Sequence, residues 1–267
     1  MNIVEPILFQ CKFNAPALAI CTPGSVVEAL TYGELERAIH NVARTALARG
    51  LAPRMTVAIA VKETLFHAAL ALGLLRLGIA TTSGASKNVL TDLHVDAVIS
   101  DVPRVRSGEE RILIADMSWL EGDGIPLDYD RLNQFREDDL CDISLTSGTT
   151  GEPKAIGLSH RIMRRRMSND MYSKGPRFAQ AAPGYCDFRI GTPVGFRMML
   201  SQLWRGSTIY FLGTDSSAIL DAFTRNEIRS MTVAPFGLGQ FMRAFEDEPA
   251  LTSNFDHILC VGAALSW

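Results

Sequence analysis

The sequence predicts an α/β protein with largely parallel sheets and helices on both sheet faces. Two observations support this fold class. Apolar, β-branched segments alternate along the chain with segments of helical periodicity, as in α/β proteins. The strand-like segment at residues 56–61 is apolar throughout, which is typical of a strand buried on both faces. A chain of 267 residues, 47% hydrophobic and 21% charged, can form one large domain or two modest ones.

The first clear helix signal is a capping box. Thr31 stands three residues before Glu34, so the threonine hydroxyl and the glutamate carboxylate can satisfy each other's backbone N–H groups. Apolar residues then recur at helical spacing from Leu35 to Leu47. Gly50 follows as a helix stop. We therefore predict a helix that begins after Thr31 and ends before Gly50.

The remaining elements follow the same alternation. Residues 65–77 predict a second helix, apolar nearly all round and therefore buried, and Gly78 ends it. Further strands are predicted at residues 97–99, 111–115, 143–146, 155–158, 208–212, 231–234 and 258–261, and further helices at residues 159–174, 198–204, 217–226 and 238–245. Residues 116–140, which contain glycines, a proline and eight acidic residues, predict a polar connector. The acidic residues from Glu137 to Asp142 could form a metal cluster, but a solvated connector is the favoured interpretation.

Charge and cysteine content narrow the functional classes. With 26 Lys and Arg against 29 Asp and Glu, the net charge of −3 gives no electrostatic case for a nucleic-acid partner. The five cysteines form no Cys-x-x-Cys pair and the five histidines show no ligand spacing, so we predict no metal site. The apolar stretch Ala68–Leu75 is far shorter than the roughly 20 residues of a membrane span. With no signal peptide visible either, we expect no membrane partner and a cytoplasmic protein.

One segment carries a chemical signal. Six consecutive residues are hydroxylic or glycine, and a lysine follows: Thr146, Ser147, Gly148, Thr149, Thr150, Gly151 and Lys154. Glycines let backbone amides approach a ligand closely, and successive amides form an anion-binding concavity. The spacing differs from a Walker loop, and a strand rather than a helix follows. Composition thus favours a strand–loop–strand phosphate site, with a polar hairpin loop that binds nothing as the alternative.

Residues 146–154, Thr-Ser-Gly-Thr-Thr-Gly-Glu-Pro-Lys, resemble the signature loop of the adenylate-forming (AMP-binding) superfamily. This superfamily includes acyl- and aryl-CoA synthetases, nonribosomal peptide adenylation domains and luciferases. Leu30–Leu35, Leu74–Ala80 and Gly262–Ser266 are similar to other segments of the family and occur in the same order. The resemblance therefore extends from about residue 31 to the last residue.

The resemblance implies an ATP-dependent ligase. Members activate a small-molecule carboxylate to an acyl-adenylate, release pyrophosphate, and usually pass the acyl group to a thiol of CoA or a carrier protein. By this resemblance the loop residues Thr146, Ser147, Gly148, Thr149, Thr150, Gly151 and Lys154 would bind the ATP phosphates, with Mg²⁺ sharing their charge. Phe196, Gly262, Ala263 and Ala264 would border the nucleotide and acyl pocket.

The resemblance also implies an architecture: the N-terminal part of the family's large domain, without the C-terminal lid. We expect two α/β subdomains with a boundary between about residues 116 and 175. The family's later motifs, its adenylation lysine among them, have no counterpart here, so no catalytic residue is assigned and we expect this polypeptide alone to be inactive. Apolar surface that the missing part would cover should promote self-association. The alternative is a non-catalytic nucleotide-binding or interaction module.

The segment after the loop contains a basic run, Arg161 and residues 164–166, just behind His160. One interpretation is a docking site for the phosphates of CoA or for another acidic partner. Met163, Met167 and Met171 recur every fourth residue, however, which favours an amphipathic helix with a solvated arginine face.

Overall fold

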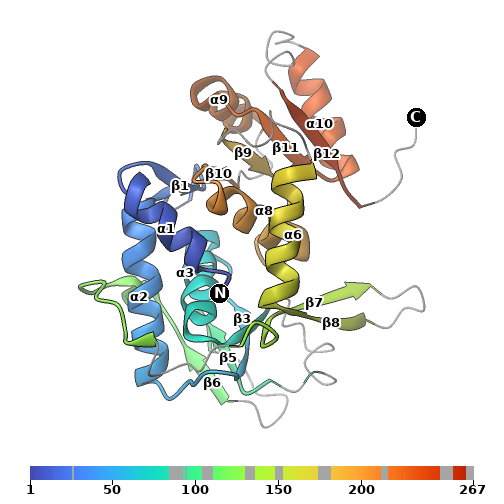
Figure 1. The fold of residues 1–267 in the computed structure, drawn as a ribbon. Helices are drawn as coiled ribbons and strands as arrows, with labels where there is room; N and C mark the ends of the chain where they lie inside the picture. The colour runs from blue at the N-terminus through green and yellow to red at the C-terminus, as the bar shows by residue number, and fades with distance from the viewer. Residues whose placement is uncertain are drawn as a thin grey trace.

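The computed structural model describes residues 1–25, 27–83, 93, 95–103, 111–129, 136–147, 153–173, 182–211, 216–246 and 255–262. Within these residues the strands form two six-stranded sheets, and Figure 1 shows one above the other. The lower sheet, in the order β6-β5-β3-β4-β7-β8, comprises β3 (Thr56–Ala60), β4 (Ala80–Ser83), β5 (Ala97–Ser100), β6 (Arg111–Ile114), β7 (Leu140–Ser147) and β8 (Pro153–Ser159).

The upper sheet has the order β12-β11-β9-β10-β1-β2. It comprises β1 (Leu18–Cys21), β2 (Ala29–Thr31), β9 (Gly184–Cys186), β10 (Ile209–Tyr210), β11 (Ser230–Val233) and β12 (His257–Cys260). All described pairs are parallel except β1–β2 and β7–β8. The predicted α/β class with largely parallel sheets is thus confirmed.

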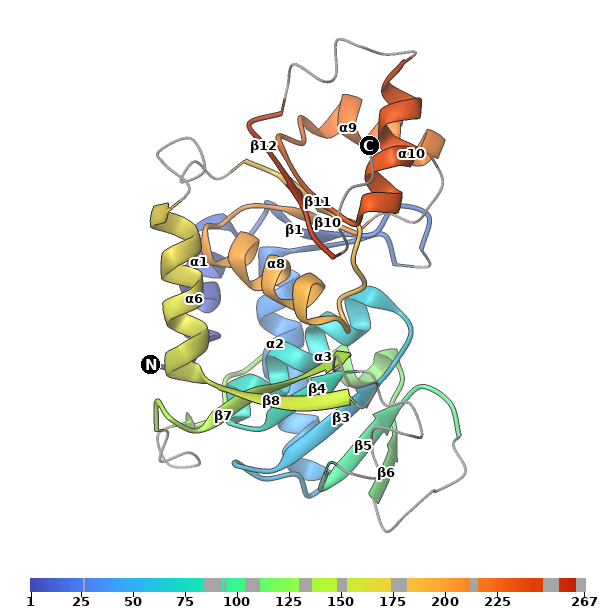
Figure 2. The same ribbon diagram turned by 90° about the vertical axis from the view of Figure 1, so that its right-hand side faces the viewer.

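The helices form two layers around the sheets. In both views the helices α1 (Glu5–Asn14), α2 (Tyr32–Ala48), α3 (Thr64–Leu77) and α8 (Pro193–Trp204) lie between the sheets. Helix α6 (His160–Ser173) rises beside them from the end of β8 toward the upper sheet (Figure 2). The helices α9 (Ser216–Asn226) and α10 (Pro235–Glu246) cover the outer face of the upper sheet, and the short 3-10 helix η1 comprises Met117–Leu120.

Local signals explain where α2 and α3 begin and end. The capping box is present, with the Thr31 N–H donating to Glu34 Oε2 (2.8 Å) and the Glu34 N–H donating to Thr31 Oγ1 (3.2 Å). Gly78 ends α3 with φ +83°, the left-handed conformation that glycine adopts without strain. A Cβ at Gly73 would lie 2.5 Å from Val42 Cγ1, so the glycine is what lets α3 approach α2 closely.

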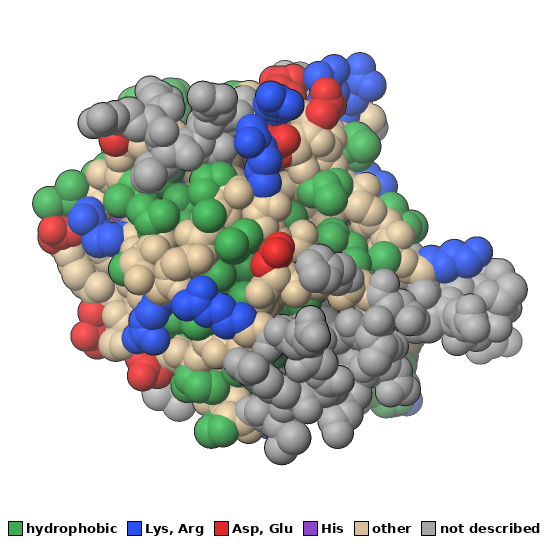
Figure 3. Space-filling model, turned by 90° about the horizontal axis from the view of Figure 1, so that it is seen from below, with side chains coloured by type: hydrophobic (Ala, Val, Ile, Leu, Met, Phe, Trp, Pro, Cys, Tyr) green, Lys and Arg blue, Asp and Glu red, His purple; other side chains and the backbone are tan. Residues whose placement is uncertain are grey.

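The main hydrophobic core is shared by both sheets. It contains Ile20 of the upper sheet, Val57 and Ile59 of the lower sheet, and most apolar residues of the helices between them. A second cluster, rich in aromatic rings, packs α9 and α10 onto the upper sheet. Ala58 and Val98 belong to a third, small cluster on the face of the lower sheet that points away from the helices. Figure 3 views the molecule from that side, where apolar side chains are visible among charged ones.

Some elements differ from the sequence prediction. Helix α8 begins at Pro193 rather than residue 198, because Thr192 caps it by accepting a hydrogen bond from the Gly195 N–H (3.1 Å). The predicted strand at 208–212 is described as a strand only at Ile209–Tyr210. Helix α1 and strands β1, β2, β4 and β9 were not predicted. How the chain divides into subdomains stays a prediction.

Candidate functional site

The predicted phosphate loop connects two paired strands. Strands β7 and β8 are antiparallel, with Thr146 opposite Lys154 and Ser147 opposite Pro153 in the last pairs. The predicted strand–loop–strand arrangement is therefore confirmed. Gly148, Thr149, Thr150 and Gly151 lie outside the described residues, and Thr146 and Ser147 are described by their backbone alone. Their role in phosphate binding stays a prediction.

Lys154 is the loop residue whose side chain the structure describes. It is exposed and lies second in β8, next to the point where the chain leaves the loop. A lysine ammonium is a compact charge on a flexible stem, so it can follow a phosphate without a fixed fork geometry. Its position fits the predicted role, because the cation is directly beside the segment that would surround the phosphates.

The start of α8 carries the predicted aromatic pocket residue. Phe196 lies in the first turns of this helix and is only 5% exposed, packed into the main hydrophobic core. The preceding turn is tight, since a Cβ at Gly195 would lie 2.2 Å from the carbonyl oxygen of Arg189. Arg189 itself is exposed in the segment between β9 and α8. The sequence gives no signal for Arg189, because an isolated arginine in a loop has no distinctive spacing.

The end of β12 carries the other predicted pocket residues. Gly262 follows the strand with φ +127°, a conformation that other residues rarely adopt. It is exposed. The Val261 N–H donates to the Val233 carbonyl (2.9 Å), so the chain stays attached to β11 until the glycine turns it away. Ala263 and Ala264 lie outside the described residues. The pocket roles of Phe196 and Gly262 stay predictions.

These segments face the same side of the molecule. In Figure 1 the loop end of the β7–β8 hairpin and the end of β12 both lie on the right, and in Figure 2 the start of α8 lies between them. The hairpin, α8 and β12 belong to different parts of the chain, yet their ends converge at the carboxyl edges of the two sheets. Ligands of open α/β sheets bind at such edges.

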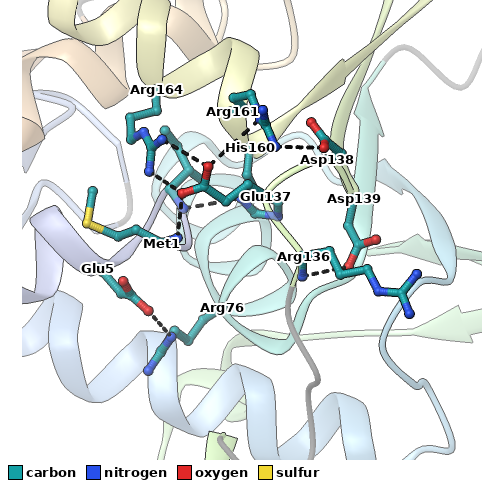
Figure 4. A network of polar contacts seen from close by, with 11 residues as sticks. Met1, Glu5, Arg76, Arg136, Glu137, Asp138, Asp139, His160, Arg161 and Arg164 are labelled. Carbon is teal, nitrogen blue, oxygen red and sulfur yellow. Dashed lines mark hydrogen bonds and ion pairs between the residues drawn. The ribbon is translucent and has the colours of Figure 1, made fainter.

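The opposite end of the hairpin is closed by a charged network (Figure 4). The backbone N–H groups of His160 and Arg161 donate to the carbonyls of Asp139 (3.2 Å) and Glu137 (2.8 Å). Arg164 binds the Glu137 carboxylate with both terminal nitrogens (2.6 and 3.1 Å). This pairing, together with the α-ammonium group of Met1, which lies 3.2 Å from Glu137 Oε1, lowers the pKa of Glu137 to about 2. The residues before β7 and after β8 are therefore fixed to each other.

The basic run of α6 is explained by this network and by packing. Met163 and Met167 are buried, and the side chain of Met171 lies outside the described residues. Arg161 and Arg164 pair with Glu137 and Asp138, and the two arginines that follow are exposed. The amphipathic helix with a solvated arginine face is confirmed.

Two ionisable groups near the hairpin have pKa values altered by burial. Burial lowers the pKa of His160 to about 4, so its imidazole is neutral near pH 7. Burial raises the pKa of Asp142 to about 6, although Ser144 Oγ donates to its carboxylate (2.6 Å). Asp142 lies on β7 four residues before Thr146, whereas the sequence favours a solvated connector for the acidic residues from Glu137 to Asp142. That interpretation was wrong for Asp142, which is 7% exposed.

The described part of the chain shows neither a metal cluster nor a membrane-spanning helix. There, no three His, Cys, Asp or Glu side chains lie close enough together to hold a metal ion. Among the described helices, none is both long enough and apolar enough to cross a bilayer. A small cavity lined by Gln202, Arg205, Ser230 and His257 lies at the amino ends of the upper-sheet strands, away from the converging segments.

Two helix-flanked, largely parallel sheets, with a Ser/Thr/Gly hairpin loop at the carboxyl edge of the lower sheet, match the architecture expected for the N-terminal part of an adenylate-forming enzyme. Comparison with known proteins specifies the family. The sequence model of the AMP-binding enzyme family matches residues 10–266. The chain therefore belongs to the AMP-binding enzymes, a family that activates carboxylates as adenylates.

The relatives include CoA ligases and peptide synthetases. A 4-chlorobenzoate–CoA ligase of Arthrobacter sp. is 26% identical over 282 residues, which cover 98% of this chain and 53% of the ligase. Cyclosporin synthetase of Tolypocladium inflatum is 24% identical over 289 residues, 99% of this chain and 2% of the synthetase. The N-terminal domain of FACL13 from Mycobacterium tuberculosis has the same fold, with a TM-score of 0.83 at 18% identity over 99% of this chain and 71% of that one. The chain spans about half the length of the curated ligase it matches.

Proposed function

We propose that this chain binds ATP through the β7–β8 loop and takes part in activating a small-molecule carboxylate to an acyl-adenylate. Transfer to the thiol of CoA or of a carrier protein follows in the complete reaction. The observation that carries the proposal is the Ser/Thr/Gly sequence of the loop, held between two paired strands at the carboxyl edge of the lower sheet. The names of the relatives span aryl-CoA ligases and peptide synthetases, so the acid itself is left open.

The loop residues supply hydrogen-bond donors and one cation. Thr146, Ser147, Gly148, Thr149, Thr150 and Gly151 would offer hydroxyl and backbone N–H groups to the phosphates, and Lys154 a positive charge. Negative charge grows on the departing pyrophosphate, so donors fixed at that place favour the transition state over the ground state. Mg²⁺, when bound with ATP, would neutralise part of the phosphate charge.

The carboxylate would enter between α8 and the end of β12. The start of α8 lies on this side (Figure 2), and the partial positive charge at a helix N-terminus favours an anion nearby. Phe196 would form the apolar floor of the pocket, and Gly262, Ala263 and Ala264 its border toward the nucleotide. The small side chains at the border leave room for an adenylate to lie against the backbone.

Titration calorimetry with MgATP tests the loop assignment. We expect Lys154→Ala to weaken MgATP binding about tenfold, because a charge-assisted contact to phosphate is lost. Lys12→Ala is the matched control, since Lys12 is an exposed lysine in the last turn of α1. Equal MgATP affinity in Lys154→Ala and the unsubstituted chain would remove the loop assignment.

The reaction itself needs a second measurement. Carboxylate-dependent exchange of labelled pyrophosphate into ATP by the full-length protein reports adenylate formation. Exchange with at least one acid of a panel of aryl, fatty and amino acids would support the proposal. MgATP binding without exchange for any acid would favour the non-catalytic nucleotide-binding module.

A further inference from the structure

The backbone of Ile3 connects two helices, α6 and α8. Helix α6 follows the phosphate-loop hairpin, and α8 carries Phe196. The Ile3 N–H donates to His160 Nδ1 (3.2 Å) at the start of α6. The Ile3 carbonyl accepts a hydrogen bond from Trp204 Nε1 (2.9 Å) at the end of α8. Ile3, His160 and Trp204 are 1%, 1% and 8% exposed. Both hydrogen bonds are therefore shielded from water, which makes the loss of either one costly.

The position of Ile3 is fixed independently of these two bonds. The neighbouring Asn2 is 2% exposed, and its Nδ2 donates to the carbonyl of Leu75 (2.8 Å) at the end of α3. Asn2 Oδ1 accepts from the Val4 N–H (2.9 Å), and Val4 is completely buried in the main core. The segment of residues 2–4 is thus anchored on α3, and α6 and α8 both bind to this anchored segment.

His160 connects the segment of residues 2–4 to the phosphate-loop hairpin. It is the first residue of α6 and directly follows β8, and its own N–H donates to the carbonyl of Asp139 just before β7 (3.2 Å). Figure 4 shows it at the centre of the network that closes the hairpin. Since the imidazole is neutral, Nδ1 is available as an acceptor for the Ile3 N–H. A displacement of His160 would therefore move the base of both hairpin strands.

Trp204 connects the same segment to α8, the helix that carries the predicted pocket residue Phe196. It is the last residue of α8, whose first turn holds Phe196. Helices α6 and α8 also meet through the Arg197 guanidinium, which binds the Asp170 carboxylate with two nitrogens (Nε to Oδ2 2.9 Å). The Asp170 side chain is 6% exposed, so this second attachment is buried on the α6 side. Helix α6 is thereby held to α8 near both of its ends.

We infer that the His160–Ile3–Trp204 bridge fixes the phosphate-loop hairpin relative to α8, and that His160 and Trp204 are positioning residues for nucleotide binding. The inference rests on the proposed function, because it assumes that ATP lies between these two elements. A ligand that spans two elements binds best when their separation is set in advance, since no ordering free energy is then lost on binding. Without the bridge, the hairpin base and α8 shift relative to each other.

Paired substitutions at His160 separate positioning from stability. His160→Leu removes the acceptor and leaves the Ile3 N–H buried without a partner. His160→Asn places Oδ1 close to the position of Nδ1 and keeps an acceptor. At a temperature where circular dichroism shows each variant fully folded, we expect MgATP binding to weaken about tenfold in His160→Leu. The affinity of His160→Asn should stay within about twofold of the unsubstituted chain.

Two further variants complete the test. Trp204→Phe keeps a large ring but removes the Nε1–H donor to Ile3, and we expect severalfold weaker MgATP binding. Asn41→Ala is the control for lost stability: it removes two partly buried hydrogen bonds, from Asn41 Nδ2 to the Leu120 carbonyl (2.8 Å) and from the Gly124 N–H to Asn41 Oδ1 (3.0 Å), away from α6 and α8. This control should lower the melting temperature and leave MgATP affinity unchanged.

The outcomes distinguish the inference from the function on which it rests. If the unsubstituted chain does not bind MgATP, the proposed function fails. If it binds, and His160→Leu and Trp204→Phe bind equally well, the bridge does not position the site. Equal weakening in Asn41→Ala, or in His160→Asn and His160→Leu alike, also overturns the inference. If His160→Leu does not fold, Trp204→Phe against Asn41→Ala decides the question.

Discussion

Helices α3 and α10 each cover a sheet, but they are buried to very different extents. Helix α3 lies between the two sheets, and nearly all of its side chains, polar and apolar, are buried. Helix α10 lies on the outer face of the upper sheet. Phe241 and Phe245 point into the aromatic cluster, whereas Phe236 (74%) and Met242 (56%) are exposed.

The difference indicates two levels of stability in one chain. The inner layer consists of the helices between the sheets with the main core, and the outer layer consists of α9 and α10 with the aromatic cluster. A residue of α3 contacts a core shared by both sheets, so its loss affects the whole fold. A residue of α10 contacts only the outer cluster, so its loss can be confined to the outer layer. The candidate site lies at the edge of both layers, with the hairpin and α8 on the inner layer and the end of β12 beside the outer one.

The largest effect is expected from the inner layer. Leu70→Ala removes a completely buried side chain of α3 and leaves a cavity in the shared core. We expect a loss of about 3 to 5 kcal/mol in the free energy of unfolding. Urea denaturation followed by circular dichroism should show the midpoint falling for the entire transition. A loss below about 1 kcal/mol would contradict the assignment of α3 to the shared core.

The second-largest effect is expected at acidic pH, which should lower the free energy of unfolding through the inner layer. Burial lowers the pKa values of His40, His67 and His160 to about 4 each, and all three lie in helices that pack on the shared core. The unfolded chain then binds protons more readily, so stability is lost as pH falls from about 6.5 toward 4, by about 1 to 2 kcal/mol for each histidine at pH 5. Asp142, with its pKa raised to about 6, works in the opposite direction and offsets about 1 kcal/mol.

Urea midpoints measured between pH 8 and pH 5 check this balance, with a net loss of about 3 kcal/mol expected. His67→Gln isolates one contribution, since it keeps a neutral polar side chain that takes up no proton. Unchanged stability across this window would show that these imidazoles are not held neutral by burial.

The smallest effect is expected from the outer layer. Phe241 lies in T-shaped contact with Tyr185 and Phe223 (ring centroids 5.1 and 5.6 Å apart). Phe241→Leu keeps an apolar side chain but removes these ring contacts, so we expect a loss of about 1 to 2 kcal/mol. Hydrogen exchange should rise in α9 and α10 and stay unchanged in α3. A uniform rise across both layers would mean that the two layers unfold together.

The sequence predicted the elements whose signals are local. Helix α2 follows from a capping box and a regular apolar face, and α3 from an unbroken apolar run ended by a glycine. Helix α1 was missed because its apolar residues form no regular face, although Glu5-Pro6 is a helix-start signal. Strands β2 and β9, three residues each, are too short for a periodic pattern to be recognised.

For the candidate site, the sequence alone determined the two flanking strands and carries the prediction of phosphate binding, because hydroxyls, glycines and a lysine occur in one short run. Only the tertiary structure decided which distant segments meet there. Ile3 binds His160 and Trp204 across 157 and 201 residues of chain, and no pattern within a short window records such a pairing. The same holds for Asp142, whose burial depends on the strands paired beside it rather than on its acidic neighbours.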